Sequence, residues 1–246
     1  MISSKATLIA ASVFLILSGC NESTKIVAAS KDEALPILAA PAGADWTETT
    51  VKTAEGGMLM GNPAAPVKLI EYGALSCSHC AHFAETSRIG LKAMIATGRV
   101  SYEFRNFLLN VIDVPAALLA RCGGSGPFFP ISEQLFATQA DWLGKMSTVT
   151  PAEQASWAKL TPEQLAPQLA IKLGLDQFVQ ARGIGAEKAK ACVSSKAGID
   201  ELGQMSKVAQ EKFKVTATPT FIINGLVVSG VGDWDMLAPE LKRAGA

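Results

Sequence analysis

Two cysteines separated by two residues carry the clearest chemistry in this sequence, in the motif Cys77-Ser78-His79-Cys80. The motif follows a predicted strand and opens a predicted helix, where unpaired backbone N–H groups and the positive end of the helix dipole stabilise a thiolate. A protonated His79 adds positive charge close to the Cys77 sulfur. Cys80 follows one helical turn later, so it can resolve a mixed disulfide formed at Cys77. The motif predicts thiol–disulfide exchange in which Cys77 attacks and Cys80 resolves.

A structural metal site is one alternative for this motif, because both histidines of the chain, His79 and His82, lie in or beside it. A closed zinc site takes four ligands, commonly as two pairs, and no second Cys/His pair occurs at motif spacing elsewhere in the chain. A merely structural disulfide is a second alternative, but a bridge across two residues closes too small a loop to constrain the unfolded chain much. We favour a redox-active pair that needs no metal and no soluble cofactor.

The elements that position the motif read as an α/β domain. Residues 67–72 are typical of a mostly buried strand, and residues 100–107 of the next strand. Between them, residues 77–97 have the spacing of a helix with apolar positions at Phe83, Ile89, Leu91 and Ile95. A strand, a helix and a strand in this order predict a parallel pair. Further strands are expected at residues 47–53, 58–60, 220–223 and 226–229, with a hairpin turn at Asn224-Gly225 and a final helix at 234–244.

A long helical segment separates the two β-containing parts of the chain. Residues 111–213 are helical in pattern, interrupted by prolines and glycines. Helices are expected at residues 132–143, 150–158, 161–173, 176–181, 186–194 and 199–213. We interpret 111–213 as a helical subdomain inserted between the first part of the domain, residues 46–110, and its second part, residues 214–246.

Several motifs together resemble the DsbA family of exported thioredoxin-fold disulfide oxidoreductases, over about residues 45–246. They are Gly61-Asn62-Pro63, the strand 67–72, Cys77-Ser78-His79-Cys80 followed by Ala81-His82-Phe83, and Ala217-Thr218-Pro219-Thr220-Phe221 with Asn224-Gly225. The resemblance implies an α/β thioredoxin fold with an inserted helical subdomain. It departs from the best-known member at Ser78, where that protein has proline, so the strength of the oxidant does not follow from the resemblance.

The resemblance also implies roles for three residues outside the motif. Pro219 is expected to be cis beside the dithiol, and Thr218 and Pro219 to expose backbone groups that pair with a substrate chain. A loop proline with a trans bond is the alternative. Glu71 is expected to be a buried acid that exchanges protons with Cys80, the alternative being an exposed carboxylate at the strand end.

The N-terminus predicts export. Lys5 precedes an apolar run at residues 6–17 that has the length of a secretory signal and is too short to span a membrane. Leu17-Ser18-Gly19-Cys20 resembles the bacterial lipobox, so we expect a lipoprotein signal peptide at 1–19, lipidation of Cys20 and a tether at 20–45. The alternative is an ordinary signal cleaved near Val27, which leaves a soluble periplasmic protein.

Two cysteines remain in the helical segment, Cys122 and Cys192. In an oxidising compartment, a second, non-catalytic disulfide between them is the simplest interpretation. Two unpaired buried cysteines are the alternative.

Composition narrows the classes of function. With 22 Lys and Arg against 22 Asp and Glu, the chain has no basic excess with which to neutralise nucleic-acid phosphates. The 49% of hydrophobic residues suffice for a buried core and exclude a wholly disordered chain.

The sequence therefore predicts a thiol:disulfide oxidoreductase of the bacterial envelope, lipid-anchored in the periplasm, that introduces disulfides into reduced exported proteins. The resemblance implies that a DsbB-type, quinone-linked membrane oxidase recharges the pair. A disulfide reductase or isomerase with the same site is one alternative, and a non-enzymatic metal-binding or chaperone lipoprotein is another. Isomerases of this wider group usually carry an N-terminal dimerisation domain. Residues 21–45 are too short and plain to form one, so we expect a monomer.

Overall fold

The computed structural model describes residues 34–246. The predicted signal peptide, the predicted lipidation site Cys20 and the first part of the predicted tether lie outside the described residues. Within residues 34–246, no helix combines the length and the apolar character needed to cross a bilayer.

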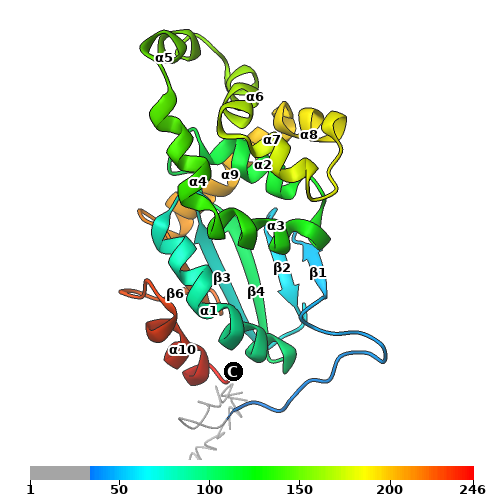
Figure 1. Cartoon of the computed structure of the whole chain (residues 1–246). Helices are drawn as coiled ribbons and strands as arrows, with labels where there is room; N and C mark the ends of the chain where they lie inside the picture. Colours follow the sequence, from blue (N-terminus) through cyan, green and yellow to red (C-terminus); the bar gives the residue numbers. More distant parts are fainter. Residues whose placement is uncertain (1–33) are drawn as a thin grey trace, which may run out of the picture. The chain divides into compact units, whose positions relative to one another are not determined.

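A six-stranded mixed sheet forms the centre of the described chain, in the order β1-β2-β4-β3-β5-β6 (Figure 1). Its central strands, β3 and β4, are parallel, and every other neighbouring pair is antiparallel. The predicted strand–helix–strand unit is thus confirmed. The strands are β1 (Thr50–Lys52), β2 (Met58–Gly61), β3 (Val67–Gly73), β4 (Val100–Asn106), β5 (Thr220–Ile223) and β6 (Leu226–Val227).

Alternation along β3 explains the two layers that cover the sheet. Leu69 belongs to the main core, which is packed with residues of α1 (Ser78–Ala96) and α3 (Ser125–Ala137). Tyr72 points to the opposite face, where it packs with Met205 of α9 (Lys196–Phe213) and Ile222 of β5. Successive residues of a strand point to opposite faces, so both faces of this strand are buried.

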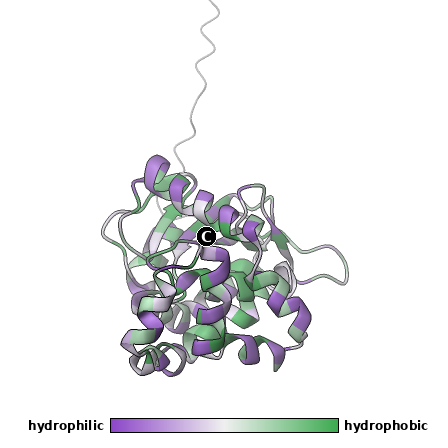
Figure 2. Ribbon diagram, turned by 90° about the horizontal axis from the view of Figure 1, so that it is seen from above, coloured by the Kyte–Doolittle hydropathy of each residue, from purple (hydrophilic) through white to green (hydrophobic). Residues whose placement is uncertain are grey.

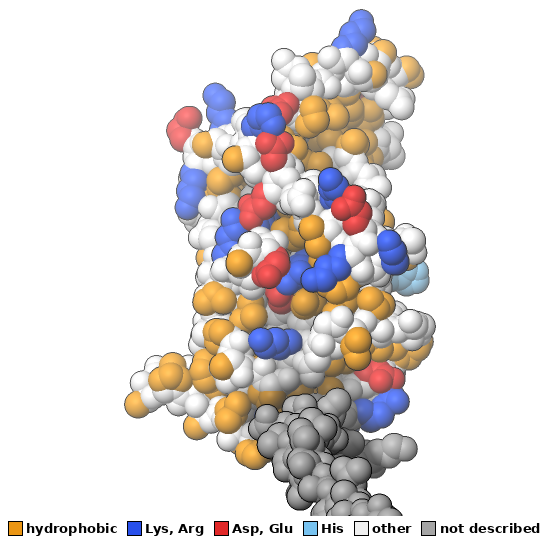
Figure 3. All heavy atoms as spheres, turned by 180° about the vertical axis from the view of Figure 1, so that it is seen from behind, with side chains coloured by type: hydrophobic (Ala, Val, Ile, Leu, Met, Phe, Trp, Pro, Cys, Tyr) orange, Lys and Arg blue, Asp and Glu red, His pale blue; other side chains and the backbone are white. Residues whose placement is uncertain are grey.

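Along the chain, the remaining helices follow β4 and precede α9, except for the C-terminal helix. Figure 2 shows hydrophobic and hydrophilic residues mixed along the helical ribbons. On the face shown in Figure 3, positive and negative side chains are interspersed. The helices are α2 (Asp113–Arg121), α4 (Gln139–Gly144), a short 3₁₀ turn (Lys145–Thr148), α5 (Pro151–Trp157), α6 (Pro162–Leu173), α7 (Leu175–Gln180), α8 (Ala186–Val193) and α10 (Trp234–Arg243).

The clearest differences from the expectations concern α3 and Ile89. Helix α3 begins at Ser125 rather than at residue 132 and ends at Ala137, so the predicted helix 132–143 is two helices. Proline is tolerated in the first helical turn, where Pro127 lies, and burial of Phe128 and Phe129 holds this turn against the core. Ile89 was expected on the apolar face of α1 but is 80% exposed. The buried stripe runs instead through residues such as Phe83, Ser87 and Leu91.

The segment that leads into the sheet is held to one end of the domain. The Leu35 N–H donates to the Gly245 carbonyl (3.1 Å), and the Leu38 N–H donates to the Thr97 carbonyl (2.9 Å). A side chain at Gly98 would collide with the Leu38 carbonyl oxygen, so glycine permits this approach. From Leu35 onward, therefore, the segment predicted as a tether contacts the domain, at the end of α1 remote from Cys77.

Candidate active site

Cys77 is the N-cap residue of α1, with extended backbone (φ −83°, ψ 121°). Its sulfur accepts the Cys80 N–H at 3.5 Å, one of the N–H groups that have no partner within the helix. Cys77 is 8% exposed and Cys80 is fully buried, and neither is in a disulfide. The strand-to-helix junction thus leaves Cys77 slightly exposed and encloses Cys80 completely.

The pKa values of the two thiols are shifted in opposite directions. Hydrogen bonds, the strongest from the Cys80 thiol, lower the pKa of Cys77 from 9.0 to about 5, against the opposing effect of burial. Burial, followed by the hydrogen bond to Cys77, raises the pKa of Cys80 well above its usual value. At neutral pH Cys77 is a thiolate and Cys80 a thiol that donates to it.

His79 contributes through its backbone. Its N–H is among the groups that lower the pKa of Cys77, whereas its imidazole is exposed. His82 is also exposed on α1. Among residues 34–246, no group of three or more His, Cys, Asp and Glu side chains is placed to hold a metal ion.

The loop before β5 faces the same sulfur. The Thr218–Pro219 peptide bond is cis. The Cys77 sulfur lies 3.2 Å from the Thr218 carbonyl oxygen, to which the protonated thiol donates, although the two residues are far apart in sequence. The Thr218 hydroxyl is buried and also lowers the pKa of Cys77. The residues of the two sequence motifs therefore meet at one point.

Glu71 lies on β3 and is 1% exposed, so the alternative of an exposed strand-end carboxylate does not hold. One carboxylate oxygen accepts the Tyr102 hydroxyl at 2.6 Å, and the other has no partner. Burial raises the pKa of Glu71 from 4.5 to about 8, and its charge in turn raises the pKa of Cys80. Tyr102, on the neighbouring β4, was not foreseen, since an alternating strand pattern gives no reason to single it out.

Two residues of the helical segment also reach the dithiol loop without having been predicted. The Asp113 carboxylate accepts the Ser76 N–H at 2.9 Å. The Gln139 side chain donates to the carbonyls of Leu75 (2.7 Å) and Cys77 (3.0 Å). Asp113 at the start of a helix was a detectable signal for capping, but nothing in the sequence pattern marks Gln139.

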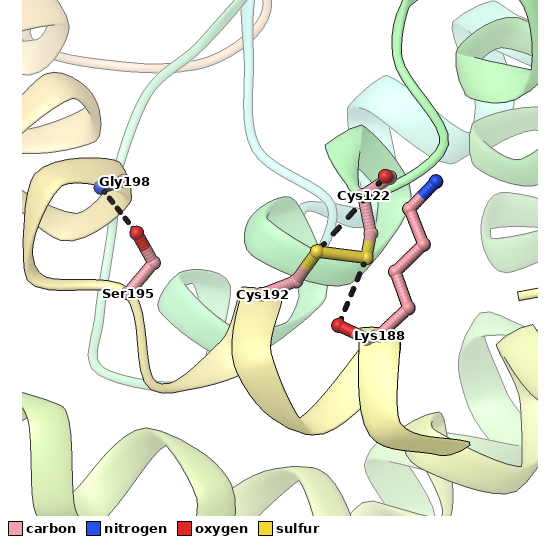
Figure 4. The surroundings of a disulfide bond; sticks show 5 residues. All are labelled: Cys122, Lys188, Cys192, Ser195 and Gly198. Atoms are coloured by element: carbon pink, nitrogen blue, oxygen red, sulfur yellow. Dashed lines mark hydrogen bonds between the residues drawn. A yellow bond between two sulfur atoms is a disulfide. The ribbon is translucent and has the colours of Figure 1, made fainter. Parts of the chain in front are cut away.

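The cysteines of the helical segment form a disulfide, shown in Figure 4. Cys122 follows the last residue of α2, and Cys192 lies in α8, with a Cα–Cα distance of 5.7 Å. Just beyond it, the Ser195 hydroxyl caps α9 by accepting the Gly198 N–H at 3.1 Å (Figure 4). The bridge joins the C-terminal end of α2 to α8.

Comparison with known proteins agrees with this geometry. The family model described as Thioredoxin matches residues 53–242, which is most of the chain. This chain belongs to the thioredoxin family. The solved structure of protein-disulfide isomerase from Novosphingobium aromaticivorans is 32% identical, with a TM-score of 0.72, over 76% of this chain and 97% of that one.

Two further comparisons show lower sequence identity. A Rickettsia typhi protein provisionally named a protein-disulfide oxidoreductase is 28% identical over 73% of this chain and 59% of its own length. The chain spans about three fifths of the length of the curated relatives it matches. Wolbachia pipientis alpha-DsbA1 shares the fold, with 21% identity and a TM-score of 0.62 over 79% of this chain and 93% of that one. The predicted resemblance to DsbA-like proteins and the predicted thioredoxin fold are therefore confirmed.

Proposed function

We propose that this protein is a DsbA-type thiol:disulfide oxidoreductase that introduces disulfides into exported proteins through Cys77 and Cys80. The observation that carries the proposal is the split in acidity between the two sulfurs, with the pKa of Cys77 at about 5 and that of Cys80 far higher. Strong stabilisation of the thiolate favours the reduced form of the pair, which makes its disulfide a strong oxidant.

The proposed reaction proceeds in two exchanges. A client thiolate attacks the Cys77 sulfur of the disulfide form, the Cys77–Cys80 bond breaks, and Cys80 leaves with the electron pair. Glu71, protonated at neutral pH because of its raised pKa, supplies a proton to this buried sulfur. The second client thiolate then attacks the client sulfur of the mixed disulfide, and Cys77 leaves as a stable thiolate. The client is oxidised by two electrons and the pair is reduced.

Thr218 and Pro219 are proposed to hold the client beside Cys77. The Thr218 carbonyl already meets the Cys77 sulfur, so an extended client chain that pairs with this loop would bring its cysteine next to the same atom.

The cellular setting is part of the proposal and rests on the sequence. We place the protein in the bacterial periplasm, anchored through lipid on Cys20, with reduced exported proteins as clients and a DsbB-type membrane oxidase as the recharging partner. We expect a monomer. Radiolabelled palmitate incorporated by the wild-type chain and not by Cys20→Ala tests the anchor.

An isomerase or reductase is the second candidate, favoured by the 32% identity to a structure titled protein-disulfide isomerase. The same residues catalyse the reverse reaction when the reduced pair attacks client disulfides. The reduction potential of the Cys77–Cys80 pair therefore decides between the functions. Equilibration of the purified chain with glutathione measures it. A value around −120 mV supports the oxidase, whereas a value near about −270 mV contradicts it.

Two further experiments separate the oxidoreductase from a metal-binding or chaperone lipoprotein. A Cys80→Ala variant is expected to accumulate mixed disulfides between Cys77 and client proteins in cells, because the resolving thiol is gone. Stoichiometric zinc or copper that survives dialysis of the wild-type protein would instead favour metal binding.

A further inference from the structure

The dithiol loop is held from the helical segment as well as from the sheet. Gln139 is the first residue of α4, and its side-chain nitrogen donates to two carbonyls of the loop, those of Leu75 at 2.7 Å and Cys77 at 3.0 Å. The side chain is buried, with 8% of the residue exposed. Both N–H groups of one amide are therefore used on the backbone that carries the attacking sulfur.

A second contact holds the residue between these two carbonyls. Asp113, the first residue of α2, is fully buried and accepts the Ser76 N–H at 2.9 Å. Its other oxygen accepts the N–H groups of Leu109 (3.0 Å) and Asn110 (3.2 Å), and the Asn110 amide donates to the Ser76 hydroxyl at 3.1 Å. Three consecutive loop residues are thus fixed by side chains from outside the strand–helix unit.

We propose that Gln139 is a positioning residue for Cys77: its amide fixes the N-cap conformation of Cys77 and offsets the negative ends of two carbonyl dipoles next to the reactive sulfur. The inference rests on the function proposed above and deepens it, because it assigns to the helical segment a part in setting the reactivity of the dithiol.

Gln139 acts on Cys77 through geometry and through charge. The N–H groups at a helix N-terminus stabilise a thiolate at the N-cap only while the backbone directs the sulfur towards them. In this structure the Cys80 nitrogen lies 3.5 Å from the Cys77 sulfur. A preorganised polar environment stabilises charge without reorganising. Loss of the two donors frees the loop and leaves the carbonyl of Leu75 without the amide that now offsets it.

The groups around Cys77 that can carry charge lie on several elements. They are Cys80 and His79 on α1, Glu71 on β3 and Asp113 on α2. Gln139 is neutral at every pH, so its replacement shifts the titration of Cys77 without adding a titration of its own.

The test uses Gln139→Met in the full chain, a substitution of similar length without N–H groups. We expect the midpoint of Cys77 alkylation against pH to rise by at least one pH unit. We also expect the equilibrium with glutathione to shift at least tenfold towards the disulfide form, about 30 mV for this two-electron couple. Gln168→Met, at an exposed position of α6, is the matched control and leaves both unchanged.

A merely structural role gives a different result. If Gln139→Met lowers the melting temperature while the alkylation profile and the glutathione equilibrium stay as in the wild type, the positioning role is wrong. Gln139→Asn keeps a buried amide but is one methylene too short to reach both carbonyls, so it tests the same shift in a milder variant. A wild-type chain that does not exchange with glutathione refutes the proposed function itself, whereas exchange with unchanged variants refutes only the role of Gln139.

Discussion

Cys77 and Cys80 are chemically the same side chain, and their surroundings make one a thiolate and the other a thiol. Cys77 sits where a helix begins, while Cys80 is enclosed one turn inside it. The negative charge on Cys77 and the raised pKa of Cys80 support each other, because the Cys80 thiol is the strongest donor to the Cys77 sulfur. The division of labour follows from a difference of three positions along the chain.

This mutual dependence predicts a pH profile. Alkylation of Cys77 by iodoacetamide is expected to reach half its maximum rate near pH 5, where its pKa lies, and to be level at pH 7. In Cys80→Ala the midpoint moves upward towards the usual value of 9.0, because the largest stabilising donor is removed. Mass spectrometry of the labelled residue measures both. A wild-type midpoint near pH 9 contradicts the prediction.

Glu71 predicts a second pH effect, on stability. Its folded pKa of about 8 lies above the usual 4.5, so the folded state holds the proton more tightly than the unfolded state. The contribution of the protonated Glu71 to the free energy of unfolding is fully present below pH 4.5 and is lost as the pH rises through about 8. We expect Glu71→Gln to match the wild type at pH 4 and to be more stable at pH 8 by on the order of 4 kcal/mol.

Urea unfolding of the reduced proteins at both pH values measures this difference. Glu85→Gln, at an exposed site on α1, is the control and shows no such gain. Equal stability of Glu71→Gln and wild type at pH 8 would show that Glu71 ionises in the folded state as freely as in water.

At the scale of elements, α1 connects the dithiol to the rest of the domain. A substitution at Gly90 tests how closely α1 packs against α10. Gly90 faces α10, and a methyl group there would collide with the Trp234 indole. Gly203 on α9 has open space around it. Gly90→Ala is expected to destabilise the protein, although alanine favours helices by about 1 kcal/mol, whereas Gly203→Ala stabilises it by about that amount. Thermal unfolding compares the two; a stabilised Gly90→Ala contradicts the packing.

Elements were predictable where one local rule dominated. The strands around the dithiol followed from their mostly apolar residues and the hairpin from Asn224-Gly225, because these signals lie within a few residues. Ile89 was misplaced because helical spacing alone does not say which face meets the sheet. Tyr102 and Gln139 were missed for a different reason: their partners lie about 30 and about 60 residues away in sequence, and only the tertiary fold joins them.

At the scale of the whole molecule, one covalent link closes a loop through most of the helical segment. Cys122 and Cys192 are 70 residues apart, so the bridge removes much of the freedom of the unfolded chain. We expect the double variant Cys122→Ala/Cys192→Ala to fold but to lose up to about 4 kcal/mol of unfolding free energy. Urea denaturation of oxidised proteins measures the loss. Unchanged stability would mean that the bridge constrains nothing that packing does not already hold.

The contacts of Leu35 and Leu38 have a practical consequence for handling the protein. They fasten the N-terminal segment beside Thr97 and Gly245, whereas Cys77 lies at the other end of α1. A helix of 19 residues is about 28 Å long. Coupling the protein to a resin or sensor chip through residues before Leu35 therefore attaches it at the end of the domain opposite the dithiol. Solutes then reach the Cys77 side of the domain without hindrance from the support.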